Sequence, residues 1–333
     1  MEDRDEPREA GPSAGFTWGD LLEDLVAREG TLTAVAEKLA AAGKWEEDVG
    51  SVERALRRLR GRGQKAGGKW GTRALAVFGL PGSVRARLRW MGAYHSRFTD
   101  LPVSVCDDLV RLWDHPPTTE RREDRVWLAL ARATIALRGN DFIAAKAELD
   151  RAERDLTVAP EAAKIEAALV LGFIASRAAP EDVAALLARV PPLMKRVPEG
   201  DERACLHARY IDQRAYALGT KDDDDAVGAE RESMYRQIPT ENAPPFALCR
   251  RANGLAYALW KQGKKEEAAA HAREAARHAG DGGHVRMRAM ALAMLARIER
   301  GPEGEEARQR ATEISRRLED ETLKARFEKL PRR

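Results

Sequence analysis

The order of apolar and polar residues predicts helices along most of the chain, with ordered structure beginning near Phe16. Apolar positions recur every three or four residues in three short segments, at about 17–30, 31–43 and 52–60. Thr17 and Asp20 resemble a capping box, and Ser51 is the expected N-cap of the third segment. Further helices are expected at about 72–78, 84–98 and 107–113.

The third segment has two chemically different faces. At about 100° per residue, its apolar residues fall on one narrow face and its arginines on the other. The apolar residues are Val52, Ala55, Leu56 and Leu59, and the arginines are Arg54, Arg57, Arg58 and Arg60. Because the apolar face must pack on the two preceding helices, we expect the arginines to point into solvent.

From about residue 125 the pattern becomes a series of helical hairpins, which begin near 125, 161, 202, 245 and 284. A period of this size is typical of stacked helical repeats. Two hairpins align, WLALARATIALRGNDFIAAKAELDRAERDL and NGLAYALWKQGKKEEAAAHAREAARHA. Each has a glycine at the turn (Gly139, Gly263) and an alanine five positions later (Ala144, Ala268).

This spacing resembles the tetratricopeptide repeat (TPR) family, which implies hairpins stacked into a superhelix. A generic α-solenoid is the alternative. We therefore expect an all-α fold, with an N-terminal helical (helix-turn-helix-like) module followed by a TPR-like α-solenoid of about five helical hairpins. The expected segments are a disordered tail at 1–15, a basic helical module at 16–115 and the repeat domain at 120–330, with His115-Pro116-Pro117 near the boundary.

Charge changes this interpretation, because it is unevenly distributed. The 333 residues include 57 Lys and Arg and 54 Asp and Glu. Residues 54–99 carry twelve of the basic residues and no acidic one, so a block of net charge +12 lies in a remainder of −9. Clustered cations attract polyanions and release their counterions. The sequence therefore predicts a polyanionic partner for this block.

Two segments within the basic region resemble a helix-turn-helix. TLTAVAEKLA would be the supporting helix and SVERALRRLR the recognition helix, although the connection AAGKWEEDVG is longer than the usual turn. Arginines on such a helix can bind phosphates or guanine edges. The predicted nucleic-acid-binding residues are Arg54, Arg57, Arg58, Arg60, Arg62, Lys65, Lys69, Arg73, Arg85 and Arg89.

The loop that follows this helix, GQKAGGK at 63–69, matches the first seven positions of a phosphate-binding P-loop. Trp70 stands where a magnesium-binding hydroxyl is required, and a helix precedes the loop instead of a buried strand. The loop is therefore interpreted as a mobile basic arm and not as part of an NTPase.

The repeat region carries a second candidate site. If Gly263 is the turn glycine, the preceding helix points a set of polar and aromatic residues at the concave side of the solenoid. TPR proteins bind peptides at similar positions, so the resemblance implies a protein or peptide partner here. The predicted partner-binding residues are Arg250, Asn253, Tyr257, Trp260 and Lys261. Ordinary packing between repeats is the alternative.

Other classes of function find little support in the sequence. Cys106, Cys205 and Cys249 are too widely spaced for a disulfide framework or a CxxC metal site, and we identify no catalytic constellation, metal site or cofactor motif. The N-terminus lacks the pattern of a secretion signal, and no apolar run approaches the length of a membrane span. We expect a cytoplasmic, non-enzymatic protein that does not enter the membrane.

The combined pattern favours a DNA-binding regulator whose TPR-like domain binds a protein or peptide. This order of domains resembles that of bacterial peptide-responsive transcription regulators, and it is compatible with a homodimer. The alternative is a protein–protein scaffold or adaptor whose basic block docks an acidic partner or RNA.

Overall fold

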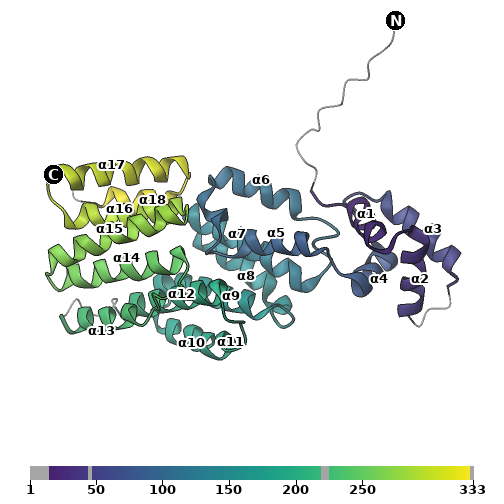
Figure 1. Ribbon diagram of the computed structural model, residues 1–333, viewed down its shortest axis with the longest axis horizontal. Coiled ribbons are helices and arrows are strands. Elements are labelled where there is room, and N and C mark those ends of the chain that lie inside the picture. Colours follow the sequence, from purple (N-terminus) through teal and green to yellow (C-terminus); the bar gives the residue numbers. More distant parts are fainter. Residues whose placement is uncertain (1–14, 44–46, 219–224, 331–333) are drawn as a thin grey trace, which may run out of the picture. The chain divides into compact units, whose positions relative to one another are not determined.

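The computed structural model describes residues 15–43, 47–218 and 225–330, and these residues form an all-helical protein (Figure 1). Helices α1 to α18 and two short 3₁₀ helices account for the regular structure, and the described ranges contain no β-strand. The prediction of an all-α fold is confirmed. The predicted disordered tail at 1–15 lies outside the described residues, except for Gly15.

The chain divides into two compact units, each made of two stretches of sequence. The first unit contains the described residues up to Leu88 together with Asp108–Arg125, and the second contains Arg89–Asp107 together with the residues from Val126 onward. The expected segments, 16–115 and 120–330, differ from this division because residues 89–107 belong to the second unit.

The first unit is built on α1 (Trp18–Glu29), α2 (Leu32–Ala42), α3 (Val49–Arg60) and α4 (Gly68–Phe78). The expected capping box is present, since Thr17 accepts a hydrogen bond from the Asp20 amide and Asp20 accepts one from the Thr17 amide. The expected Ser51 cap is wrong: Asp48 caps α3 by accepting from the Ser51 amide at 3.0 Å, so the helix begins at Val49.

The second unit is a stack of helices in which neighbours in sequence pack side by side (Figure 1). Helices α5 (Gly82–Gly92), α6 (Val103–Trp113) and α7 (Arg122–Arg138) contain the residues at which the units divide. The short helices are η1 (Arg97–Asp100), η2 (Pro180–Asp182), α10 (Val183–Ala188) and α11 (Val190–Met194). The longer ones are α8 (Phe142–Leu156), α9 (Glu161–Ala178), α12 (Asp201–Ala217), α13 (Asp225–Arg236), α14 (Pro245–Lys261), α15 (Lys265–Asp281), α16 (Val285–Ile298), α17 (Pro302–Arg317) and α18 (Glu321–Glu328).

Small residues allow the helices of this unit to approach closely. Ala256, Ala268, Ala272 and Ala289 are fully buried in the core shared by α14, α15 and α16. Gly254 has the same role against α13, because a Cβ on it would lie 2.0 Å from the ring of Tyr235. Close helix contacts in this unit therefore depend on side chains that are short or absent.

The two aligned hairpins turn differently from one another. Gly263 has a φ of 77°, a left-handed conformation that suits glycine, as expected of the turn between α14 and α15. In the earlier hairpin Gly139 lies at the turn as predicted, and the next residue, Asn140, has the left-handed conformation with a φ of 63°. Asparagine tolerates this conformation better than most side chains.

Residues 89–107 are held in the second unit by hydrogen bonds to distant helices. Arg138 donates to the Leu101 carbonyl at 2.7 Å, and the Val103 amide donates to the Leu318 carbonyl at 3.1 Å. The Asp100 carboxylate accepts from the Arg286 amide at 2.7 Å. These bonds explain why this stretch packs with residues that follow it by more than thirty positions. Among the described helices, none has both the length and the apolar character needed to cross a membrane.

Candidate functional site

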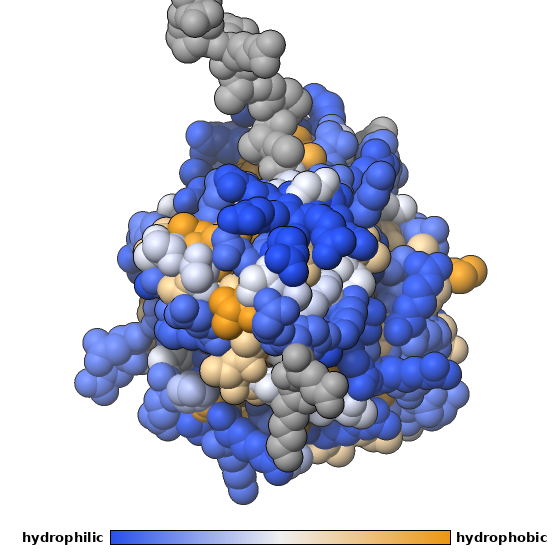
Figure 2. Space-filling view, turned by 90° about the vertical axis from the view of Figure 1, so that its right-hand side faces the viewer, coloured by the Kyte–Doolittle hydropathy of each residue, from blue (hydrophilic) through white to orange (hydrophobic). Residues whose placement is uncertain are grey.

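The two faces of α3 are arranged as the sequence predicts. Val52, Ala55, Leu56 and Leu59 are at most 3% exposed and form part of the core of the first unit. The arginines at 54, 57, 58 and 60 are exposed. Figure 2 views the side on which α1 to α4 lie in Figure 1, and its surface is largely hydrophilic with scattered apolar residues. The expected array of exposed arginines is therefore present on α3.

Carboxylates from outside the basic block neutralise part of this array. Arg57 forms an ion pair with Glu53, one helical turn earlier. Arg60 pairs with Glu23 of α1, with 2.7 Å between Nη2 and Oε1. The absence of acids between residues 54 and 99 therefore does not describe the surroundings of these arginines in space.

Glu47 neutralises two further members of the block. Its Oε1 lies 2.5 Å from Lys69 Nζ and 3.0 Å from Arg73 Nη1. Hydrogen bonds from Lys69 and then Arg73 lower the pKa of Glu47 to about 2, so it is ionised at neutral pH. Glu47 lies only a few residues before the block in sequence, yet it contacts α4.

Most of the remaining predicted residues form no ion pair with a carboxylate of the described residues. They are Arg54, Arg58, Arg62 and Lys65. Arg85 is exposed as well. Arg54 donates to Ser51 Oγ at 2.9 Å, and Arg62 donates to the Ala66 carbonyl at 2.6 Å. Arg89 belongs to the second unit, where it pairs with Glu202. The cationic surface available at the end of α3 is smaller than the sequence block.

The glycine-rich loop is anchored, which differs from the expected mobile arm. Trp18 donates from Nε1 to the Lys65 carbonyl at 2.9 Å, and the Gly67 amide donates to Glu120 Oε1 at 2.6 Å. A Cβ at Gly67 would lie 2.3 Å from the Trp18 ring. The glycine here permits the loop to pack against a buried indole, and no phosphate is needed to explain it.

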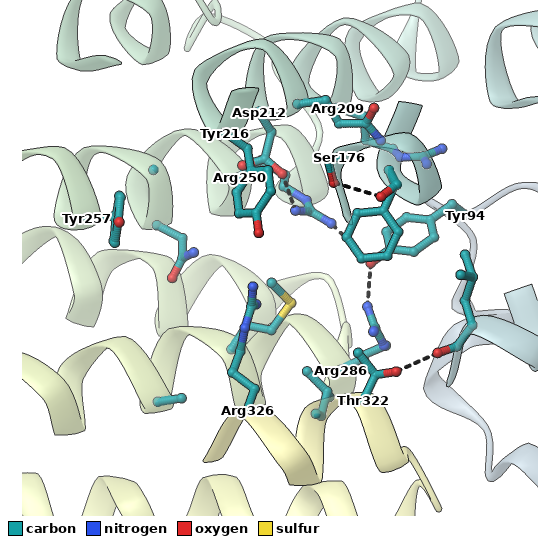
Figure 3. A pocket seen from close by; sticks show the side chains of 18 of the residues that line it. Tyr94, Ser176, Arg209, Asp212, Tyr216, Arg250, Tyr257, Arg286, Thr322 and Arg326 are labelled. Atoms are coloured by element: carbon teal, nitrogen blue, oxygen red, sulfur yellow. Dashed lines mark hydrogen bonds and ion pairs between the residues drawn. The ribbon is translucent and has the colours of Figure 1, made fainter. Parts of the chain in front are cut away.

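The second unit contains a cavity of about 400 Å³. Helices α7, α9, α12, α14, α16 and α18 contribute most of the lining residues, and α10 and α13 add Val183 and Tyr235 (Figure 3). Its basic lining residues are Arg138, Arg177, Arg209, Arg250, Arg286, Arg297 and Arg326, and Asp212 is its single acidic lining residue. An enclosed surface with seven arginines and one carboxylate is strongly cationic.

Tyr94 lies at one end of this cavity, among three of the arginines (Figure 3). Its hydroxyl accepts hydrogen bonds from Arg286 and, at 3.2 Å, from Arg250. The Arg209 guanidinium lies 4.3 Å from the centre of its ring. Burial by itself raises the pKa of Tyr94, but the charges of Arg286, Arg250 and Arg209 outweigh burial and lower it to about 8.

Each of these arginines has a carboxylate partner. Arg209 pairs with the buried Glu166, and burial lowers the pKa of Arg209 to about 9, so it remains protonated at neutral pH. Glu166 also lies 3.2 Å from His95 Nδ1. Burial, and then the charge of Arg209, lower the pKa of His95 to about 4. His95 is therefore neutral at pH 7 and adds no charge to the site.

The second pair links α12 to α14. Arg250 Nη1 lies 2.5 Å from Asp212 Oδ2, and the Tyr235 hydroxyl donates to Asp212 Oδ1 at 2.9 Å. Burial raises the pKa of Tyr235 well above its usual value, with Asp212 adding to the effect. Asp212, the acidic lining residue, is thus fully engaged with neighbours in the protein.

The third pair is a buried triad. Asp320 Oδ2 lies 2.8 Å from Arg286 Nε and 3.2 Å from Arg138 Nε, and its other oxygen accepts from the Leu323 amide at 2.9 Å. Burial opposes ionisation of Asp320, but Arg286, the Leu323 amide and Arg138 more than compensate and hold its pKa below the usual value. This carboxylate joins α7, α16 and the start of α18.

Three lining arginines have no such partner. Arg177, Arg297 and Arg326, on α9, α16 and α18, form no ion pair with a carboxylate of the described residues. Arg177 stacks on the rings of Phe142 and Phe173 at 4.8 and 5.0 Å. The Arg297 guanidinium lies 5.5 Å from the ring of Trp260. Stacking uses the face of a guanidinium and leaves its N–H donors available at the edge.

The predicted partner-binding residues divide between the cavity and its surroundings. Arg250, Asn253 and Tyr257 line the cavity, whereas Trp260 and Lys261 do not. Trp260 packs against the core of α14 to α17, and the Lys261 ammonium lies 5.4 Å from its ring. The structure thus brings three of the five residues together.

Sequence reasoning missed the other six arginines because they are spread over five helices and form no local motif. The available signal was an arginine within an apolar helical stretch, such as Arg286 and Arg297 in VRMRAMALAMLARI. Among the described residues, no group of His, Cys, Asp and Glu side chains is arranged to hold a metal ion. Comparison of the chain with protein-family models, curated proteins and solved structures finds no match.

Proposed function

We propose that this protein is a DNA-binding regulator in which a helix-turn-helix-like module contacts DNA and a TPR-like repeat domain binds a protein or peptide partner. The observation that carries the proposal is the pairing of an arginine-faced helix with a cationic cavity in a separate compact unit. A site for a polyanion and a site for a ligand are the two parts that a ligand-responsive regulator requires.

The DNA contact is assigned to the end of α3 and the turn after it. Arg54 and Arg58 are four residues apart and so share one side of the helix, and Arg62 and Lys65 follow in the turn. Because no carboxylate occupies these four cations among the described residues, they are the best candidates for phosphate or base contacts. A homodimer would present two copies of this helix to one duplex.

The repeat domain is assigned the role of the sensor. From α12 onward the helices α12, α14, α16 and α18 supply most of the lining, which supports a TPR-like repeat in which the first helix of each hairpin faces the concave side. Arg250, Asn253 and Tyr257 would hold the carboxylates and main chain of a peptide that enters the cavity. Trp260 and Lys261 would contact a part of the partner that lies outside it.

A scaffold or adaptor is the second candidate, and one observation favours it. Glu23, Glu47 and Glu53 already form ion pairs with cations of the basic block, and the carboxylates of an acidic protein could pair with the remaining cations in the same way. An acidic protein, or RNA, would then replace DNA as the partner of α3.

Fluorescence anisotropy of a labelled DNA duplex, titrated at low and at physiological salt, tests the proposal. We expect binding that weakens steeply with salt, because each phosphate contact releases a counterion. Replacing the unpaired arginines together (Arg54→Ala, Arg58→Ala, Arg62→Ala) should abolish most of it. The control is the double variant Arg57→Ala, Arg60→Ala. Because these two arginines are ion-paired, their replacement should reduce DNA binding less.

Two outcomes contradict the regulator. Wild-type protein that fails to bind duplex even at low salt would remove DNA from the proposal and favour the scaffold. Equal binding by wild type and triple variant would place any contact elsewhere than on α3.

A further inference from the structure

The unpaired arginines of the cavity, Arg177, Arg297 and Arg326, have no role in the network around Tyr94. They come from α9, α16 and α18, so residues up to about 150 positions apart in the sequence line one cavity. Figure 3 shows Arg326 extending from α18 into the open space below Tyr216 and Arg250. We call these three residues the arginine trio. Their convergence without a carboxylate needs an explanation.

The positive charges of the trio repel one another. Arg326 has an exposed side chain, and the protein packed around it still displaces part of its hydration and lowers its pKa. The charges of Arg286, Arg297 and Arg177 act in the same direction. A bound anion would reverse both effects, because it supplies the opposite charge that the surrounding protein lacks.

Three residues that line the cavity carry buried polar atoms without a hydrogen-bond partner. Arg250 is only 8% exposed, and its Nε makes no hydrogen bond. The side-chain oxygens of Asn253 and Gln213 are also buried and unpartnered. Buried polar atoms are costly to leave unpaired, so these side chains would gain from a rotation that brings the atoms to the cavity and to a ligand.

The composition of the lining limits the chemical class of ligand that the cavity can bind. All seven basic lining residues are arginines, whose planar fork suits the oxygens of phosphate and carboxylate groups. A trio of cations matches a group with about two negative charges, which a phosphate monoester carries and a single carboxylate does not. The volume of about 400 Å³ accepts a small molecule, since ligand sites typically occupy about 300–1,000 Å³.

The rest of the lining is apolar. Met290, Met294, Phe327 and Leu330 lie on the helices that carry Arg297 and Arg326 or directly after them, and Phe173 lies one turn before Arg177. Met294, Phe327 and Leu330 are largely packed in the hydrophobic core, and the parts of these side chains that reach the cavity would contact an organic group attached to a phosphate but not an inorganic ion. The site therefore fits an amphipathic anion.

We propose that the cavity binds a small organic phosphate, whose phosphate group is held by Arg177, Arg297 and Arg326 and whose apolar part packs on the methionines and Phe327. This inference rests on the proposed ligand-binding role of the second unit, and it replaces a peptide or protein by a smaller dianionic ligand. Arg250, Asn253 and Gln213 line the cavity and would offer polar groups to its organic part after rotation of their side chains.

Isothermal titration calorimetry of the full chain with a matched series of probes tests the charge requirement. Phenyl phosphate, benzoate and phenol share a ring and differ in charge, and a nucleoside 5′-monophosphate and its nucleoside form a larger matched pair. We expect both phosphates to bind and to raise the melting temperature, benzoate to bind at least about ten-fold more weakly, and the neutral compounds not to bind.

Variants place the binding on the trio. Arg326→Gln and Arg297→Gln should each weaken the binding of phenyl phosphate by about ten-fold or more. Arg326→Lys should bind better than Arg326→Gln but less tightly than wild type, because lysine lacks the bidentate fork. The control is Arg277→Gln, an exposed arginine of α15 outside the cavity that should bind as wild type does. Circular dichroism of each variant verifies that its helices are intact.

Several results would overturn the inference. Benzoate binding as tightly as phenyl phosphate would remove the dianion requirement, and failure of every phosphate to bind would remove the ligand class. Unchanged affinity in folded Arg326→Gln would move the site away from the trio. If the phosphates fail while an acidic peptide binds, or while DNA binding by α3 persists, the proposed function stands and only this inference falls.

Discussion

The arginines of α3 and the arginines of the cavity carry the same charge in opposite surroundings. Those of α3 are neighbours in sequence, are exposed, and are partly neutralised by acids from elsewhere in the first unit. Those of the cavity are scattered over some 190 residues and become neighbours only in the fold. A cluster of charge along a sequence therefore says less about local potential than a cluster in space.

The energetic consequences also differ. An exposed arginine keeps much of its hydration, so an ion pair such as Arg60–Glu23 contributes little to stability. Near Tyr94 each guanidinium has lost its hydration shell, and its carboxylate partner must compensate the lost hydration free energy. An arginine ion pair therefore changes the free energy of unfolding little in the first unit and strongly in the second. Four predictions test this contrast.

The largest effect is expected from the buried carboxylate of the triad. Asp320→Asn leaves Arg286 and Arg138 without an anionic partner and weakens the cap of α18, so it should lower the free energy of unfolding by about 3–5 kcal/mol. Urea denaturation measures it. The matched change on the exposed side, Glu23→Gln, should cost less than about 1 kcal/mol. Similar losses of unfolding free energy in both variants would contradict the proposed difference between buried and exposed ion pairs.

The second prediction concerns pH. The pKa of Tyr94 is about 8 in the folded protein, below the value of about 10 of an unfolded tyrosine, so folding favours its ionised form. The unfolding free energy should gain a contribution as the pH rises from about 8 towards 10, and this contribution is lost as the pH falls through 8. Ultraviolet absorbance of tyrosinate monitors the titration. Tyr94→Phe should remove both the early titration and the gain, and an unchanged curve would contradict the assignment.

The third prediction compares neutralisation in the two regions. Arg326→Gln should raise the melting temperature of the ligand-free protein slightly, because it relieves repulsion within the arginine trio that solvent partly screens at this exposed side chain. Arg54→Gln on α3 should change stability by less than about 0.5 kcal/mol. Thermal melts in a buffer without phosphate make the comparison. A loss of stability in Arg326→Gln would show that the trio supports the fold and is not strained.

The smallest expected effect distinguishes the paired from the unpaired arginines of α3 in DNA binding. In duplex titrations, Arg54→Gln should reduce the slope of log affinity against log salt by about 0.9, the value for one phosphate contact. Arg57→Gln should reduce it by less, because Glu53 already neutralises this arginine. Equal changes in the two slopes would mean that the Arg57–Glu53 pair opens when DNA binds.

Much of the fold follows from local sequence, because helices depend on neighbours in the chain. The Thr17 capping box, the two faces of α3 and the starts of α9 and α14 were all predictable in this way. One error was also local, where two residues compete for one role. Asp48 displaces Ser51 as the cap of α3. Gly139 lies at its predicted turn, and the left-handed residue there is the neighbouring Asn140.

The sites were less predictable, because they depend on residues that meet only after folding. Arg250, Asn253 and Tyr257 could be identified together since they project from one helix at helical spacing. No spacing links Arg177 to Arg297 and Arg326. The anchoring of the glycine-rich loop by Trp18 was equally hidden, because the indole lies 47 residues before its acceptor.

The position of Tyr94 has a practical consequence for anyone who would exchange these units between proteins. The stretch that carries this tyrosine is inserted in the sequence between the two parts of the first unit, although it packs with the second. A single crossover near residue 120 would leave Tyr94 and the Leu101 acceptor of Arg138 with the wrong parent. A working chimaera therefore needs three junctions, near residues 88, 107 and 125, each within a helix.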